Sequence, residues 1–322
     1  WDFDVPAQPT LVDLPRTGGA VPALVQATKM GLLFILDRRT GEPLFPVEER
    51  PVPPSDIPGE QASPTQPFPV LPPPLADHDL DPADAFGLLG FDARACREAF
   101  EALRWDGIYT PPSFEGSLMM PGNAGGSNWG GVAVDPGRGW VLANTMNLAW
   151  SVRLFPGERI MEERAADPEV ELGRQAGTPY GLARKMLVSP LGVPCTPPPW
   201  GELAAVDAVS GEILWQVPLG SLRDMLPIPL PISRWGTPNL GGPLVTGGGV
   251  VFIGAAIDHY LRAFDVATGE LLWKGRLEAA PVATPMTYRL RPDSRQFVVI
   301  AAGGYDRIGL ERGDALVAFA LR

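Results

Sequence analysis

The chain has 322 residues, of which 38 are proline and 37 are glycine, about twice the usual share of these two helix-breaking types. This composition excludes a coiled coil, a helical bundle and a helical solenoid, while 45% hydrophobic residues, with 9 Trp and 13 Phe, exclude a disordered chain. The net charge of −11, without any lysine- or arginine-rich run, argues against nucleic acid as a partner. We therefore expect a loop-rich, mainly β protein.

Targeting and metal signals are sparse in this sequence. No apolar run approaches the ~20 residues that span a bilayer, and no signal peptide precedes Trp1. We therefore expect a mature form or a piece of a longer chain, without a membrane segment of its own. With only His78 and His259 available, histidine-based zinc sites and Ser-His-Asp catalysis are poorly supplied.

The first predicted element is a strand and turn that contain Ile35, Asp37, Gly41 and Phe45. This segment is a degraded copy of a motif that returns twice later in the chain. Residues 43–82 follow, and their proline clusters indicate a long surface insertion rather than regular structure.

The middle of the chain contains the one helix that the sequence predicts. Residues 91–104 place Cys96 and Phe100 near one helical face. Residues 156–180 are charged and carry glycine and proline, which predicts a second loop insertion. Because no clear boundary interrupts the chain, we treat residues 1–322 as part of a single domain.

An internal repeat occupies residues 205–215 and 263–273, which share the pattern Ala-x-Asp-x-x-x-Gly-x-x-x-Trp and start 58 residues apart. The pattern predicts a β-hairpin turn in which Asp and Ser or Thr bind backbone amides and Gly supplies positive φ. A hairpin cannot bury its tryptophan alone, so the unit must dock on a neighbour, which indicates a propeller or an array. The alternative is two unrelated hairpins with a common turn.

Several further segments resemble the quinoprotein dehydrogenases that use pyrroloquinoline quinone (PQQ), in particular the membrane-bound glucose, quinate and shikimate dehydrogenases. The resemblance covers essentially the whole chain. The segments that carry it are Trp1-Asp2-Phe3-Asp4, Leu36-Asp37-Arg38-Arg39-Thr40-Gly41, Pro64-Thr65-Gln66-Pro67-Phe68, Tyr109-Thr110-Pro111-Pro112-Ser113, Pro121-Gly122-Asn123, Asn128-Trp129-Gly130-Gly131, Gly192-Val193-Pro194-Cys195, Gly241-Gly242-Pro243 and Ala283-Thr284-Pro285-Met286-Thr287-Tyr288.

The resemblance implies an all-β fold, an eight-bladed propeller of four-stranded antiparallel blades. The chain matches the C-terminal half of that domain, so we expect a partial propeller of about four blades with long loops and one short helix. An open arc of blades exposes strand edges, which predicts poor solubility or oligomerisation. We also expect this chain alone neither to hold PQQ tightly nor to turn over substrate.

The resemblance also implies the chemistry. A hydroxyl of a sugar, polyol or cyclitol is oxidised to a carbonyl at the periplasmic face of the bacterial inner membrane, and the electrons pass to ubiquinone. The C5 carbonyl of PQQ accepts hydride, and a divalent cation, Ca²⁺ or Mg²⁺, polarises that carbonyl. The alternative is a non-catalytic propeller with PQQ-like repeats that serves as a periplasmic scaffold or assembly protein.

Three polar residues match functional positions of the family. Asp2 matches the catalytic base and is a candidate metal ligand, with any further ligands expected upstream; Lys29 matches the cation beside the quinone oxygens; and Asn144 matches an amide that binds PQQ. The competing interpretations are a solvated aspartate, an exposed edge-strand lysine and a strand-ending asparagine. A scaffold has no reason to hold all three in matching places.

Leu240 and Tyr305 match positions that line the cofactor and substrate cavity. Tyr305 departs from the glucose enzymes, where this position is typically histidine, and Asp306 stands where glycine is typical. These departures put glucose itself in doubt. For quinate or shikimate, Arg307 is a candidate partner of the substrate carboxylate.

Cys96 and Cys195 match family cysteines and lie 99 residues apart. A disulfide persists in the periplasm. We therefore predict a bridge that ties the helix at 91–104 to the loop at Cys195.

Overall fold

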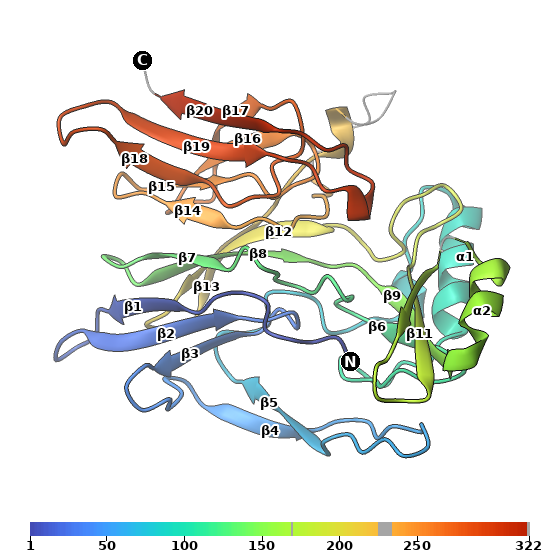
Figure 1. Cartoon of the computed structure of the whole chain (residues 1–322). Coiled ribbons are helices and arrows are strands. Elements are labelled where there is room, and N and C mark those ends of the chain that lie inside the picture. The colour runs from blue at the N-terminus through green and yellow to red at the C-terminus, as the bar shows by residue number, and fades with distance from the viewer. Residues whose placement is uncertain (169, 225–233, 321–322) are drawn as a thin grey trace.

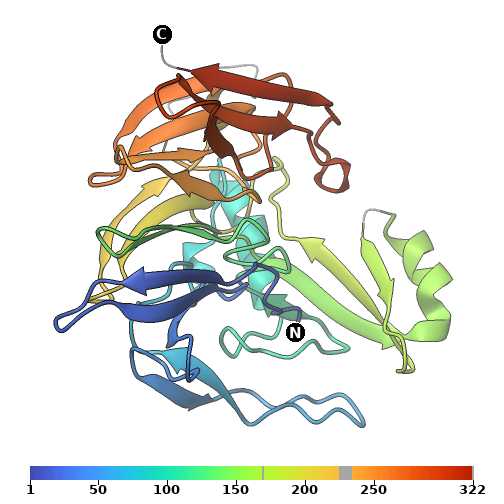
Figure 2. The same ribbon diagram turned by 60° about the vertical axis from the view of Figure 1, so that its left-hand side comes forward.

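The computed structural model describes residues 1–168, 170–224 and 234–320. Four antiparallel β-sheets are stacked in chain order, from the N-terminal strands at one end to the C-terminal strands at the other (Figures 1 and 2). Among the described residues, no helix has both the length and the apolar character needed to cross a membrane.

The four stacked sheets are simple meanders. The first contains β1, β2 and β3, which span Thr10–Leu14, Val21–Ala27 and Leu33–Asp37. The second contains β7, β8, β12 and β13, which span Val132–Asp135, Trp140–Met146, Gly201–Asp207 and Ile213–Pro218. The third contains β14, β15, β16 and β17, which span Pro243–Val245, Val250–Ile253, Tyr260–Asp265 and Leu271–Arg276. The fourth contains β18, β19 and β20, which span Met286–Arg289, Gln296–Ala302 and Ala315–Ala320.

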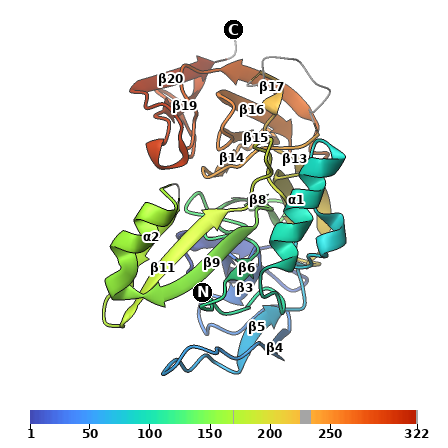
Figure 3. The same cartoon turned by 90° about the vertical axis from the view of Figure 1, so that its right-hand side faces the viewer.

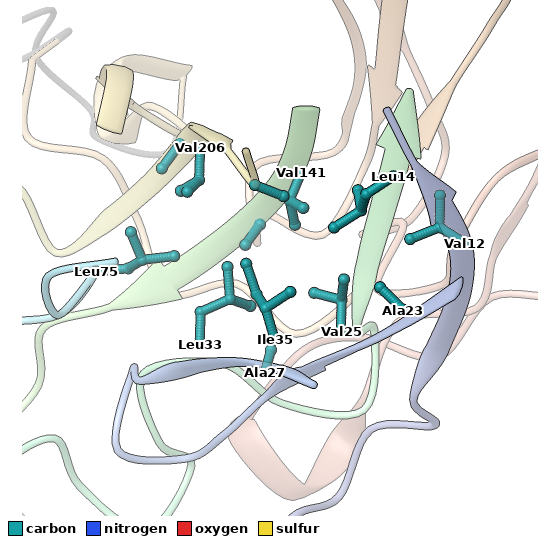
Figure 4. Close-up of a cluster of buried hydrophobic side chains, with 13 residues drawn as sticks. Val12, Leu14, Ala23, Val25, Ala27, Leu33, Ile35, Leu75, Val141 and Val206 are labelled. Atoms are coloured by element: carbon teal, nitrogen blue, oxygen red, sulfur yellow. The ribbon is translucent and has the colours of Figure 1, made fainter. Parts of the chain in front are cut away.

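The core lies between the sheets, so the central strands are buried on both faces. In β8, Val141 and Ala143 pack toward the first sheet, and Leu142, between them, packs toward the third. Figure 4 shows the first of these layers, where Val25 and Ile35 meet Val141. Because successive strand residues point to opposite faces, a strand buried on both sides must be apolar throughout. This explains why β8 lacks the alternation of a half-exposed strand.

The repeat turns have the predicted geometry. In each copy the aspartate carboxylate accepts a hydrogen bond from the backbone N–H two residues later, and its carbonyl accepts one from the N–H of the repeat glycine. These glycines have φ near +75°, which favours glycine. The aspartates are Asp37, Asp207 and Asp265.

The repeat aromatics dock on the next copy of the motif. A Cβ placed on Gly211 would lie 3.1 Å from the ring of Phe45, and one on Gly269 would lie 2.7 Å from the ring of Trp215. The Nε1 of Trp215 also donates to the carbonyl of Val266 at 3.0 Å. The prediction that the aromatic must dock on a neighbouring unit is therefore confirmed, and glycine is required there because any side chain would displace the ring.

A further sheet, here called the inserted sheet, lies beside the stack (Figure 3). Three of its four strands lie in an insertion between β8 and β12, and the fourth precedes β7. Its strands are β6, β9, β10 and β11, which span Ser117–Met119, Trp150–Pro156, Glu171–Arg174 and Tyr180–Met186. Helix α2 spans Ile160–Ala166. The segment 156–180, predicted as a loop, therefore contains a helix, the strand β10 and the turn that leads into β11. The helix has only seven residues, three of them charged, so its apolar periodicity is too short to detect.

The proline-rich insertion at 43–82 carries a two-stranded hairpin, β4 and β5, which span Val47–Pro51 and Thr65–Pro69. The predicted helix at 91–104 is present as α1, Gly90–Glu101. Short 3-10 helices η1, η2, η3 and η4 span Pro82–Asp84, Gly157–Arg159, Leu222–Asp224 and Asp306–Ile308.

The predicted disulfide is present between Cys96 of α1 and Cys195, whose Cα atoms are 5.3 Å apart. Because the bridge closes a long loop of the unfolded chain, we expect the double variant C96A/C195A to lose about 2–5 kcal/mol of unfolding free energy. Urea unfolding measures this loss. An unfolding midpoint that is unchanged in the double variant or in reductant would contradict it.

The carboxyl group of Glu202 on β12 should make the stability of the fold depend on pH. Glu202 accepts hydrogen bonds from Asn147 and Gln216, but burial raises the pKa of its carboxyl, and Asp77 adds to the rise. With the folded-state pKa above the unfolded one, stability is highest below the unfolded pKa and falls as pH rises through the folded pKa. Glu202→Gln should therefore raise Tm by about 2–4 °C at pH 7.5 and leave it unchanged at pH 4. The exposed Glu270→Gln is the control, and equal Tm shifts for both variants would refute this origin.

Candidate functional site

The N-terminal segment is anchored through its aromatic residues, which places Asp2. The rings of Trp1 and Phe3 pack edge-on against Tyr109, with centroids 5.3 and 5.7 Å away, and Nε1 of Trp1 donates to the carbonyl of Tyr109 at 2.6 Å. Burial raises the pKa of Tyr109 to about 12, so its hydroxyl is neutral. In the sequence, Asp2 and Asp4 alternate with the anchoring residues Trp1 and Phe3. Both aspartates contact Lys29 rather than Tyr109.

Lys29 lies in the tight β2–β3 turn, where the N–H of Gly31 donates to the carbonyl of Thr28. Its side chain is only 10% exposed, so it is not an edge-strand lysine on the surface. Its Nζ contacts Oδ1 of Asp2 at 2.9 Å and Oδ1 of Asp4 at 2.5 Å. Hydrogen bonding to Lys29 lowers the pKa of the Asp4 carboxyl. The structure therefore brings the predicted base and the predicted cation into direct contact.

A second cation on Asp2, which the sequence did not reveal, comes from the inserted sheet. Nη1 of Arg184 on β11 donates to Oδ2 of Asp2 at 2.8 Å, across 182 residues of sequence. Glu171 on β10 holds the rest of the guanidinium, with its oxygens 2.8 Å from Nε and 2.6 Å from Nη2. The hydrogen bonds to Glu171 raise the pKa of Arg184 further, so it stays cationic. Each oxygen of the Asp2 carboxylate thus accepts one charged hydrogen bond.

Asn144 lies within β8 and is 5% exposed, so it is a buried strand residue and does not end the strand. Its Nδ2 donates to Oδ1 of Asn239 and to the carbonyl of Gly241, the latter at 2.9 Å. Both amide hydrogens are therefore used to hold the loop that carries Leu240. Among the described residues no hydrogen bond reaches Oδ1 of Asn144, which leaves an acceptor for a ligand.

The glycine-rich loop Pro121–Gly131 joins Lys29 to Asn144. The N–H of Gly126 donates to the carbonyl of Lys29 at 2.6 Å, and Oγ of Ser127 donates to the carbonyl of Asn144 at 2.9 Å. At its far end, a Cβ on Gly130 would lie 2.2 Å from the carbonyl carbon of Gly241. The sequence identified Gly122, Gly130 and Gly131 of this loop as part of the family resemblance, but it did not identify the loop as the element that assembles the site.

Leu240 and Tyr305 share one partly apolar cluster with Ala124 of this loop and with Met146. The Tyr305 ring packs edge-on against Trp129 of the loop at 5.5 Å. Loop Pro121–Gly131 thus contacts, or shares a cluster with, all four predicted cofactor residues. The side chain of Arg307 lies outside the described residues.

The residues around the loop fit a polar, planar cofactor. Lys29 supplies a cation, and Asn144 supplies a free amide oxygen in an otherwise buried setting. Two further polar atoms at the loop are buried without a hydrogen-bond partner, Oδ1 of Asn123 and Nε1 of Trp150, whose ring lies against Gly122. An unsatisfied buried polar atom costs about 1–3 kcal/mol, which a ligand with both donors and acceptors relieves.

The described residues do not fit a complete metal site. No group of three or more His, Cys, Asp or Glu side chains in residues 1–168, 170–224 and 234–320 could hold a metal ion. The carboxylates of Asp2 and Asp4 are bonded to cations. A divalent cation at Asp2 therefore stays a prediction, and no step below depends on it.

The stacked antiparallel sheets are those of a partial β-propeller, and comparison with known proteins identifies the family. Residues 1–298 match the family model for the PQQ glucose/ethanol/alcohol dehydrogenase β-propeller domain. The chain belongs to this family, which confirms both the resemblance and the all-β propeller fold class predicted from the sequence.

The whole chain also aligns with curated relatives. It is 42% identical to the quinoprotein glucose dehydrogenase of Escherichia coli (strain K12) and 44% identical to the probable quinate dehydrogenase (quinone) of Xanthomonas campestris pv. juglandis. These alignments cover 100% of this chain but 41% and 42% of the relatives, so the chain spans about two fifths of their length.

Among solved structures, the chain is similar to the quinohemoprotein alcohol dehydrogenase from Comamonas testosteroni, with a TM-score of 0.56 and 21% identity. The similarity covers 99% of this chain and 38% of that one. At this identity it supports the fold alone.

Proposed function

We propose that the protein oxidises a hydroxyl group of a sugar, polyol or cyclitol to a carbonyl, with PQQ as cofactor. The observation that carries the proposal is the contact between Asp2 and Lys29, at 2.9 Å, in a protein of this family. PQQ, when bound, supplies the acceptor for the two electrons of the reaction.

In this proposal Asp2 takes the hydroxyl proton of the substrate. Each carboxylate oxygen accepts one hydrogen bond from Lys29 or Arg184 and keeps capacity for another. Lys29 stabilises negative charge on the reduced cofactor. Asn144, through its free oxygen, and Leu240 and Tyr305, through the apolar cluster they share, bind and shape the cofactor cavity.

The cellular setting is also part of the proposal and rests on the family resemblance. Electrons pass to ubiquinone, the reaction takes place at the periplasmic face of the bacterial inner membrane, and Ca²⁺ or Mg²⁺ accompanies PQQ. We further propose that the 322-residue chain by itself is inactive, which a dye-linked assay with added PQQ and Ca²⁺ checks directly.

The test is reconstitution of the full-length protein that carries this sequence. With PQQ and Ca²⁺ added, dye reduction is measured for glucose, other aldoses, polyols, quinate and shikimate. We expect turnover of at least one of them and saturable PQQ binding. If the protein shows no turnover and does not bind PQQ, the proposal is overturned in favour of a non-catalytic scaffold.

A further inference from the structure

A small pocket of about 210 Å³ opens beside Asp2. Its polar lining comes from Asp2, Gln175 and Arg184, and its apolar lining includes Trp1, Met119 and Leu182. The pocket therefore lies between the anchored N-terminal segment and the inserted sheet, which contributes β6, β9 and β11.

Arg184 is held more firmly than an ordinary surface arginine. It lies in register with Glu171 on β10 and Val152 on β9, so these three side chains share one face of the inserted sheet. Glu171 binds Nε and Nη2 in the two-armed manner that fixes the guanidinium plane. Only the Nη1 arm then remains directed to Asp2, and the arginine side chain is 21% exposed.

The Asp2 carboxylate is consequently fixed from two independent parts of the fold. Lys29, in the β2–β3 turn, binds Oδ1, and Arg184, in the inserted sheet, binds Oδ2. With one oxygen held from each side, the plane of the carboxylate cannot rotate without breaking an ion pair. A general base requires such orientation, since a displacement of about 1 Å can cost 100-fold in rate.

We propose that Arg184 is the positioning residue for the Asp2 base and that the pocket beside it receives one hydroxyl-bearing ring of the substrate. This inference rests on the proposed function, because it takes Asp2 as the base. The volume is below the roughly 300–1,000 Å³ of sites for drug-sized ligands, which matches a monocyclic substrate. Trp1 and Leu182 suit the C–H faces of such a ring, while Gln175 suits its hydroxyl groups.

The position of Arg184 on an insertion has a consequence for specificity. The inserted sheet lies outside the four stacked sheets, so its pocket residues can change without disturbing the layers between them. Gln175, Leu182 and Arg184 of the insertion therefore contribute to selection of the substrate ring, together with Trp1 of the N-terminal segment. The cofactor residues Lys29 and Asn144, by contrast, belong to the stacked sheets.

The first experiment measures kcat, KM and PQQ binding for Arg184→Gln in the full-length PQQ-loaded protein. We expect kcat to fall about 10- to 100-fold, KM to change less, and PQQ binding to stay the same. Arg184→Lys should recover part of the rate because it keeps the charge, and Glu171→Gln should give an intermediate loss. The matched control is Arg153→Gln, which breaks the Arg153–Glu163 ion pair of the same sheet and should keep the rate.

The second experiment does not depend on activity. Met119 lines the pocket and is 6% exposed, whereas Met161 on α2 is 72% exposed. With ¹³C-methyl methionine in the full-length protein, D-glucose or quinate should shift the Met119 signal, assigned by Met119→Leu, and leave Met161 in place. If neither probe moves Met119, the pocket assignment is overturned.

The outcomes separate this inference from the function on which it rests. If the wild type turns over substrate and Arg184→Gln does so equally well, the positioning role of Arg184 is overturned and the proposed function stands. No turnover in the wild type overturns the proposed function and, with it, the role of Arg184. A loss in Arg184→Gln that Arg184→Lys partly restores, with normal PQQ binding, supports the inference.

Discussion

Replacing Asp2 by asparagine should reduce kcat by about 100- to 10,000-fold, because asparagine cannot accept the substrate proton. The fold should tolerate this change. Lys29 keeps Asp4 as a partner at 2.5 Å, and Arg184 keeps its two bonds to Glu171. Since no buried cation loses its last partner, the unfolding free energy should change by less than about 1 kcal/mol.

The matched control is Asp4→Asn. Asp4 binds the same Lys29 but is 60% exposed and does not contact Arg184 among the described contacts. We expect this variant to keep most of its turnover. Dye-linked kinetics, PQQ titration and thermal unfolding of both variants decide the matter: if Asp2→Asn turns over normally, or if Asp4→Asn is equally inactive, Asp2 is not the base.

The fold could be predicted from the sequence because the repeat motif determines its own turn and its contact with the next copy. Asp207 and Gly211 bond within one turn, and Trp215 then requires the glycine of the next copy, Gly269. Because this short pattern recurs in the sequence, and because each aromatic needs the glycine of the next copy, the pattern predicts that the sheets stack on one another. Helix α2 was not predicted because seven residues, three of them charged, are too few to show an apolar period.

The candidate site could be predicted from the sequence only in part. Asp2, Lys29 and Asn144 could be matched to family positions, but nothing local in the sequence links Asp2 to Arg184, 182 residues away on an inserted strand. That contact arises from the strand register that places Arg184 opposite Glu171. The amide of Asn144 likewise proved to hold the Gly241 backbone, a role that only tertiary packing defines.

Replacing Gly130 by alanine should cost about 3 kcal/mol or more of unfolding free energy and weaken PQQ binding at least 10-fold. The added Cβ would lie 2.2 Å from the carbonyl carbon of Gly241 and 2.4 Å from the nitrogen of Gly242. These are backbone atoms, and Asn144 holds the Gly241 carbonyl in place. Overpacking against atoms that cannot give way is costly.

Gly247→Ala is the matched control for this prediction, because no atom lies within 4 Å of its added Cβ. It should change the unfolding free energy by no more than about 0.5 kcal/mol and leave PQQ affinity unaltered. Urea unfolding and PQQ titration of the two variants provide the comparison. A Gly130→Ala protein that keeps wild-type stability and PQQ affinity would show that the two backbones can move apart.

In Gly130→Ala, the loss of PQQ affinity can be compared with the loss of unfolding free energy. Loop Pro121–Gly131 bonds to Lys29 and Asn144 and packs Trp129 on Tyr305, so a shift at Gly130 reaches every proposed cofactor residue. The clash, however, is confined to one crossing of two backbones. PQQ affinity should therefore fall by more than the loss of stability alone explains, when measured at a temperature where the variant is fully folded. Equal affinity under those conditions would mean that the loop supports the fold but does not organise the cofactor site.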